Sequence, residues 1–187
     1  GLYNVAVGAF SLLENTTGTG NTAVGRASLK NSISGNHNAA FGWTALFYNE
    51  NGSKNTAIGT GALYENIEGN FNTALGFGAL KDNIDGSKNT AVGHSSLFSN
   101  TMGFGNIAIG DSSMFSNETG TSNIAIGHNA LNDNVDQSNL IAIGDSALFM
   151  NQAGNQNVAV GSKSMFSNAD GYDNTALGFN TLEMNVN

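Results

Sequence analysis

A phrase of seventeen residues, written eleven times without a gap, accounts for all 187 positions of this chain. With places counted from Gly1, place six is alanine and place eight is glycine in every unit. Place one is glycine except at Gln137, place four is asparagine except at Leu140, and place twelve is always leucine or methionine. A repeat this short and strict predicts a solenoid, in which each unit is one coil that buries its apolar face only against neighbouring coils.

The repeat predicts one domain, residues 1–187, of eleven stacked coils. At one strand separation of about 4.8 Å per coil, the coils would form a rod roughly 50 Å long. Both ends of the sequence fall inside the repeat, so we expect the chain to be a segment of a longer array. No apolar run is long enough to span a bilayer, and direct membrane insertion is not expected.

Places four to eight of each unit, as in Asn21–Gly25 and Asn123–Gly127, predict a short strand that ends in a glycine turn. Stacking these strands gives one long parallel sheet and an all-β fold class. The rest of the coil is either a second strand or a single helical turn. The spacing of Phe77, Leu80 and Ile84 favours a helical turn or an irregular arc, closed by asparagine and then glycine in left-handed conformations.

Side-chain alternation along the strand makes places five and seven share one face, while places four, six and eight share the other. Neither face carries a charge in any unit, because all charged residues lie at other places. If the aliphatic column at place seven is inside, a strip of Asn, Ala and Gly is outside; if alanine is inside, large aliphatics are outside. Either strip exceeds the apolar patch that monomers usually expose and predicts lengthwise self-association of parallel rods. The alternative is a monomeric solenoid in which the small residues fill a narrow interior.

Asparagines at places four and fifteen are expected to form amide ladders along the rod. Ser32 at place fifteen and Leu140 at place four each follow an asparagine, and we interpret them as one-residue slips in which that asparagine takes the ladder position. Because Gln137 replaces the glycine of place one, we expect the turn between the eighth and ninth coils to be the most irregular. The residues expected to be structural are Ala23, Gly25, Asn55, Ala57, Gly59, Leu63, Asn66, Asn89, Gly93 and Gly127.

Composition and spacing do not favour catalysis, a cofactor or nucleic-acid binding. The net charge of -8 argues against nucleic acid, and the absence of cysteine removes thiolate chemistry. His37, His94 and His128 lie on different coils, too far apart to share a metal ion, and are expected to be solvated. One weak metal candidate remains, a calcium site between carboxylates of two adjacent coils: Glu65, Glu68, Asp82 and Asp85.

Large side chains, nearly all aromatic, recur at places thirteen and nine. They predict either a core or subunit seam, which we favour, or an outer surface that contacts carbohydrate or protein through flat rings. They are Leu13, Phe47, Tyr64, Phe98, Phe115, Phe149, Phe166, Trp43, Phe77 and Phe179. A threonine array at place five suggests ice binding as a distant alternative. Place five is threonine in only five units, however, and its same-face companion at place seven is always apolar.

The segment Asn139–Gly144 resembles a phrase repeated in the heads of YadA-like trimeric autotransporter adhesins. Asn174–Gly178 resembles the N-T-A-L-G arrays of bacterial surface proteins and phage-type tail fibres. The resemblance implies a left-handed β-roll in a parallel homotrimer, on an extracellular, cell-surface or virion fibre, with adhesion or spacing as its function. The alternative it implies is a receptor-binding tail-fibre segment that recognises a glycan or protein. It identifies no binding residue by position.

Overall fold

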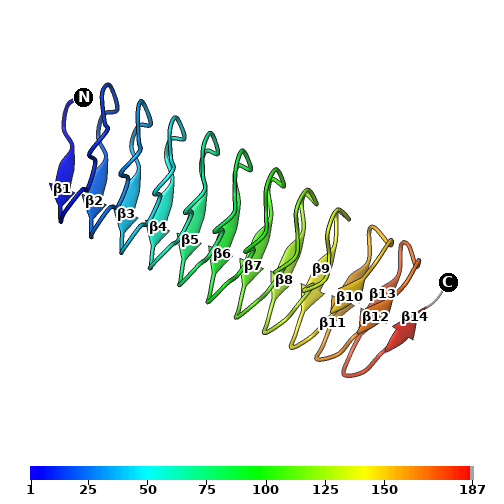
Figure 1. Ribbon diagram of the computed structural model, residues 1–187. Helices are drawn as coiled ribbons and strands as arrows, with labels where there is room; N and C mark the ends of the chain where they lie inside the picture. Colours follow the sequence, from blue (N-terminus) through cyan, green and yellow to red (C-terminus); the bar gives the residue numbers. More distant parts are fainter. Residues whose placement is uncertain (186–187) are drawn as a thin grey trace.

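The computed structural model describes residues 1–185 as a β-solenoid of about eleven turns, and the predicted fold is confirmed. Figure 1 shows the coils stacked side by side, with the two termini at opposite ends of the rod. One strand from each coil joins a parallel sheet of eleven strands. These strands are β1 Val5–Val7, β2 Thr22–Val24, β3 Ala39–Phe41, β4 Thr56–Ile58, β5 Thr73–Leu75, β6 Thr90–Val92, β7 Ile107–Ile109, β8 Ile124–Ile126, β9 Ile141–Ile143, β11 Val158–Val160 and β13 Thr175–Leu177.

The register of the sheet follows the repeat without a slip. Each residue pairs with the residue at the same place in the next coil, as Ala57 does with Ala74. β9 keeps this register although its coil begins with Gln137, because Ile141 pairs with Ile124. Every column of the sequence therefore becomes a row of stacked side chains along the rod.

The expectation of a helical turn in the second half of the coil is wrong, because residues 1–185 contain no helix. Places ten and twelve have positive φ, for example 58° at Ala27 and 50° at Leu63, whereas an α-helix needs φ near -63°. The amide of Leu63 instead donates to the carbonyl of Ala79 in the next coil, at 3.0 Å. The irregular arc is what forms, with left-handed residues at places three, eight, ten and twelve rather than at the closing asparagine and glycine.

Three of the last coils add a second, three-stranded parallel sheet. Its strands are β10 Met150–Asn151, β12 Ser167–Asn168 and β14 Met184–Asn185. In coils four to seven, three consecutive amides at the end of the coil bond to one carbonyl of the following coil, as those of Glu118, Thr119 and Gly120 do to Val135. The second sheet begins at Met150, near the end of the coil that starts with Gln137 and not at the turn that was expected to be irregular.

The interior is narrow and built from small side chains. In the coils between the two end coils, alanine at place six and leucine or methionine at place twelve are fully buried, as Ala23, Ala57 and Leu63 are. Glycine at place eight lets adjacent coils approach: a Cβ on Gly127 would lie 2.5 Å from the carbonyl oxygen of Gly144, and its φ of 134° disfavours any side chain. Gly25, Gly59 and Gly93 have the same conformation.

Asparagine amides join the coils inside the rod. At place fifteen, Asn66 Nδ2 donates to Asn49 Oδ1 at 2.7 Å and to the carbonyl of Gly69 at 3.0 Å. At place four, Asn55 Nδ2 donates to the same Gly69 carbonyl, and Asn55 Oδ1 accepts the backbone amide of Asn72. Repeated in successive coils, Asn89 included, these bonds satisfy buried turn groups that water cannot reach.

Asn31 and Asn139 do not replace the missing ladder members, so the interpretation of slips is wrong. Leu140 itself lies in the buried row at place four, and the side chain of Asn139 is exposed at place three. Ser32 likewise stays in the buried row at place fifteen, where its Oγ has no hydrogen-bond partner. Backbone pairing of the whole coil outweighs the gain from moving one amide, since a one-residue shift would turn every side chain to the opposite face.

Candidate functional site

The structure puts alanine inside the coil and the large aliphatic side chains outside. Places five and seven together form one surface along the rod, called here the sheet face. Its place-seven residues stay well exposed even in the central coils, with 42% for Ile58 and 38% for Ile109. More than a third of the side chain is exposed in Val5, Val7, Phe41, Ile58, Leu75, Ile107, Ile109, Ile126, Ile143 and Leu177.

No charged residue interrupts the sheet face, since its two columns hold only Val, Ile, Leu, Phe, Ala and Thr. The threonines expected for ice binding lie on this same face beside aliphatic neighbours. A flat apolar ribbon as long as the rod is larger than the patches that monomeric proteins usually expose. This surface can therefore bury apolar area against another flat, uncharged surface.

The aromatic residues at places nine and thirteen lie outside the coil, so the expectation of a core is wrong, while a subunit seam stays a prediction. Trp43 and Phe77 are more than half exposed. At place thirteen the rings are half-buried and stack along the rod in pairs, with centroids 5.1 Å apart for Phe47 and Tyr64. The pairs Phe98 with Phe115 and Phe149 with Phe166 repeat this stacking.

Two adjacent hollows lie between the rows at places nine and thirteen. One, of about 300 Å³, has Gly61 and Gly78 at its floor and Phe77 and Phe98 in its walls. The other, of about 370 Å³, is lined by residues of the first three coils, among them Trp43. Sequence reasoning had no signal for either hollow except the paired glycines at place ten.

Tyr64, in the wall of the smaller hollow, has a pKa raised above its ordinary value. Burial of its hydroxyl is the main cause, and the neighbouring Tyr48 and Glu65 add to it because they disfavour a phenolate. The Tyr64 hydroxyl is therefore neutral at physiological pH and can donate or accept a hydrogen bond at the wall of the hollow.

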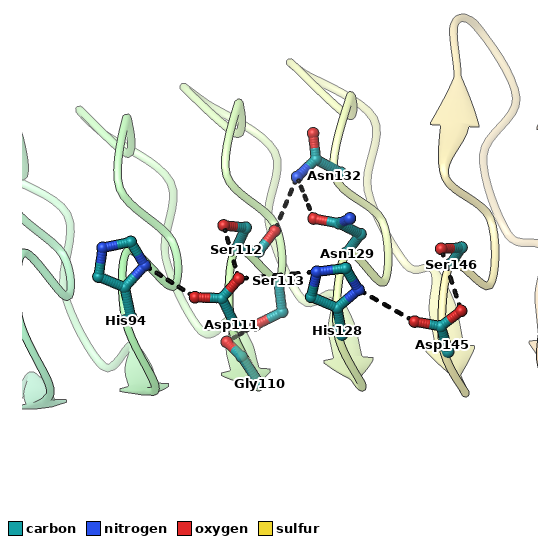
Figure 2. A network of polar contacts seen from close by, with 10 residues as sticks. All are labelled: His94, Gly110, Asp111, Ser112, Ser113, His128, Asn129, Asn132, Asp145 and Ser146. Carbon is teal, nitrogen blue, oxygen red and sulfur yellow. Dashed lines mark hydrogen bonds and ion pairs between the residues drawn. The ribbon is translucent and has the colours of Figure 1, made fainter.

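Figure 2 shows a ladder of alternating imidazoles and carboxylates at place nine of four consecutive coils. His94 Nδ1 lies 2.7 Å from Asp111 Oδ1, and Asp111 Oδ2 lies 3.7 Å from His128 Nε2. His128 Nδ1 in turn lies 3.0 Å from Asp145 Oδ1. The sequence predicted both histidines on the surface but not their pairing with the aspartates, although the order His, Asp, His, Asp is visible in the place-nine column.

The ladder lacks the geometry of a nucleophilic triad. Both ring nitrogens of His128 face carboxylates, and the hydroxyl of Ser112 lies 3.3 Å from Asp111 Oδ2 rather than near an imidazole. A triad needs one imidazole nitrogen directed at the nucleophile. All four ladder side chains are about half exposed, which makes their attraction weak and sensitive to salt.

The weak calcium candidate does not form a site in the structure. Among residues 1–185, no three His, Asp or Glu side chains come close enough together to hold a metal ion, and Glu65, Glu68, Asp82 and Asp85 are no exception. The third histidine, His37, is exposed at place three and takes no part in the ladder.

Nothing in the described part of the chain resembles a membrane-crossing helix. Comparisons with protein families, with curated proteins and with solved structures gave no match. The class of protein is thus defined by the fold alone, a β-solenoid repeat protein.

Proposed function

We propose that this chain is a structural and adhesive segment of an extracellular fibre, and that it associates lengthwise with copies of itself through the sheet face, as a parallel homotrimer. The observation that carries the proposal is the outward direction of the aliphatic column at place seven. The same kind of apolar side chain recurs in successive coils. A parallel copy of the rod can therefore pack against it coil by coil.

The size of the face is consistent with a specific interface. Ten strand spacings of about 4.8 Å and a width of about 10 Å give roughly 500 Å² of flat surface per copy. Two such faces together remove about 1,000 Å², the lower bound for a specific protein interface. Closure by rotational symmetry leaves no unpaired face and limits the assembly to a defined number of chains.

The core offers a second argument. Each coil between the two end coils buries an alanine at place six, a leucine or methionine at place twelve and an alanine or serine at place eleven, so the apolar area removed from water per coil is modest. Burial of places five and seven in an assembly would add a second apolar layer to the same sheet. Chains with thin cores commonly obtain stability from such association.

The test is the mass of the folded chain in solution, measured by light scattering over a dilution series. We expect a mass of three chains, and we expect Ile109→Glu combined with Ile126→Glu to give folded single chains of 19.3 kDa. Both side chains are more than a third exposed in the single chain, so a charge there opposes association more than it opposes folding. Ser112→Glu, which adds a charge outside the sheet face, is the matched control and should leave the mass unchanged.

A parent chain that remains at 19.3 kDa at every concentration would contradict lengthwise association. A folded assembly whose mass is unaffected by the two glutamates would show that another surface holds the copies together.

A further inference from the structure

We infer that the two hollows form one groove that binds an acidic, carboxylate-bearing polysaccharide along the rod. The groove is defined by places nine, ten and thirteen of the first six coils, from Phe10 to Phe98. Thr44 lines both hollows, so they lie next to each other along the rod. Five strand spacings give the groove a length of about 24 Å, suited to several units of a linear polymer.

The floor of the groove is open because place ten is glycine in two adjacent coils. Backbone conformation alone does not require those glycines: place ten has φ of 63° at Phe10 and 51° at Ser95, close to the 65° of Gly61. A Cβ added to Gly61 would meet no atom within 4 Å. Gly61 thus leaves empty a space that side chains of other coils occupy, whereas a Cβ on Gly78 would contact the Phe98 ring at 3.4 Å.

The walls of the groove offer aromatic faces. Trp43 and Phe77 come from place nine, two coils apart, and both are more than half exposed. The C–H groups on one side of a pyranose ring carry partial positive charge and pack well on the negative face of an aromatic ring. Aromatic groups two coil spacings apart, about 10 Å, would contact alternate sugars of an extended chain.

The charge of the groove selects an anionic polymer. Arg26, Lys30 and Lys81 line it, and no carboxylate does, although the chain as a whole carries a net charge of -8. In the part of the chain that the structure describes, neither Arg26 nor Lys30 forms an ion pair, while Lys81 lies 3.6 Å from Asp82. The Lys30 ammonium lies over the Phe47 ring, 5.3 Å from its centroid, and its N–H donors can still reach a ligand carboxylate beside the Arg26 guanidinium.

A nucleic-acid strand would also stack on aromatic rings, but it brings a phosphate with every nucleotide. Three cations in about 24 Å of an otherwise acidic rod do not balance that charge density. A polysaccharide with a carboxylate on only some of its sugars fits better. The groove and the sheet face are different surfaces, so this inference does not rest on self-association. It would make the segment a recognising as well as a structural part of a fibre.

Trp43 is the only tryptophan of the chain, so its fluorescence reports directly on the groove. The full chain is titrated at low salt with oligomers of hyaluronan, polygalacturonate and alginate, with carboxyl-reduced hyaluronan as the neutral counterpart. We expect saturable binding of at least one acidic polymer, at least tenfold tighter than the neutral one and weaker at high salt.

Two sets of variants test the site by calorimetry. Arg26→Ala with Lys30→Ala, and separately Phe77→Ala, should each weaken binding about tenfold, while Lys163→Ala outside the groove should leave it unchanged. Gly61→Phe should abolish binding by filling the floor, because Phe10 shows that phenylalanine fits this place and φ. Ser146→Phe, at the same place outside the groove, is its control for folding.

Failure of all three acidic polymers to bind the folded chain would overturn the inference, as would unchanged binding in Gly61→Phe. Tighter binding of a thymidine oligonucleotide than of any polysaccharide would also overturn it and would assign the groove to single-stranded nucleic acid. Neither result would affect the solution mass, so the two proposals fail independently.

Discussion

Ser32→Asn should stabilise the solenoid, because it completes the asparagine ladder at place fifteen. Ser32 is buried and its Oγ has no partner, and Oδ1 of Asn15 in the preceding coil is also buried without a partner. Three coils further on, Asn83 Nδ2 donates to Asn66 Oδ1 at 2.7 Å and to the carbonyl of Gly86 at 2.9 Å. An asparagine at position 32 can make the same bonds.

The magnitude follows from counting those bonds. The new amide would donate to Asn15 Oδ1 and to the Gly35 carbonyl, and its Oδ1 would accept from Asn49 Nδ2. Three hydrogen bonds contribute about 3 kcal/mol in total at roughly 1 kcal/mol each. Ordering the longer side chain costs about 1 kcal/mol. We therefore expect the free energy of unfolding to rise by about 2 kcal/mol.

The assay is urea unfolding followed by circular dichroism, at one protein concentration, because association would make the midpoint depend on concentration. Ser32→Ala is the control, since it removes the unpaired hydroxyl without adding an amide and should be nearly neutral. Asn66→Ser is the reverse change. It removes four hydrogen bonds, one of them long at 3.5 Å, and leaves Asn49 Oδ1 buried without a donor, so it should destabilise by about 2 to 4 kcal/mol.

Equal stabilities of Ser32→Asn and Ser32→Ala would refute the reasoning, because the ladder would then add nothing beyond filling space. An unchanged free energy of unfolding in Asn66→Ser would also refute it.

The remaining predictions concern one buried position and one exposed one. Gly127→Ala should lower the unfolding free energy by more than about 2 kcal/mol, because its Cβ collides with the Gly144 carbonyl at an unfavourable φ, whereas Gly61→Ala should have little effect in the same denaturation assay. Equal losses in the two alanine variants would show that positive φ alone, and not the close coil contact, makes glycine necessary at place eight. Asp111→Asn removes the carboxylate that faces both His94 and His128, and should change stability by less than about 1 kcal/mol, with the difference vanishing in 1 M NaCl. A large, salt-independent loss would mean that the ladder is a structural element rather than a solvated surface row.

The sequence by itself determined the repeat unit, the strand in each unit and the in-register parallel sheet. The reason is that a short strict period gives each residue the same neighbours above and below, so any register other than the repeat would mismatch all columns together. The asparagine column could be interpreted for the same reason. A polar side chain that recurs at one buried place lies beside the same side chain of the adjacent coils and can hydrogen-bond to it, as Asn66 does to Asn49 and Asn83.

Only the tertiary structure decided which face of the strand lies inside. The alternation of side chains at places five to seven does not show which side of the strand faces inward. Either orientation leaves an uncharged strip outside. In the folded coil, positive-φ residues such as Leu63 curve the arc of places nine to fourteen, and the leucine shares a narrow buried core with the alanine of the strand. The larger Ile58 must then point outward. The same narrow coil places Trp43 and Phe77 on the surface, because the interior has no room for an aromatic ring.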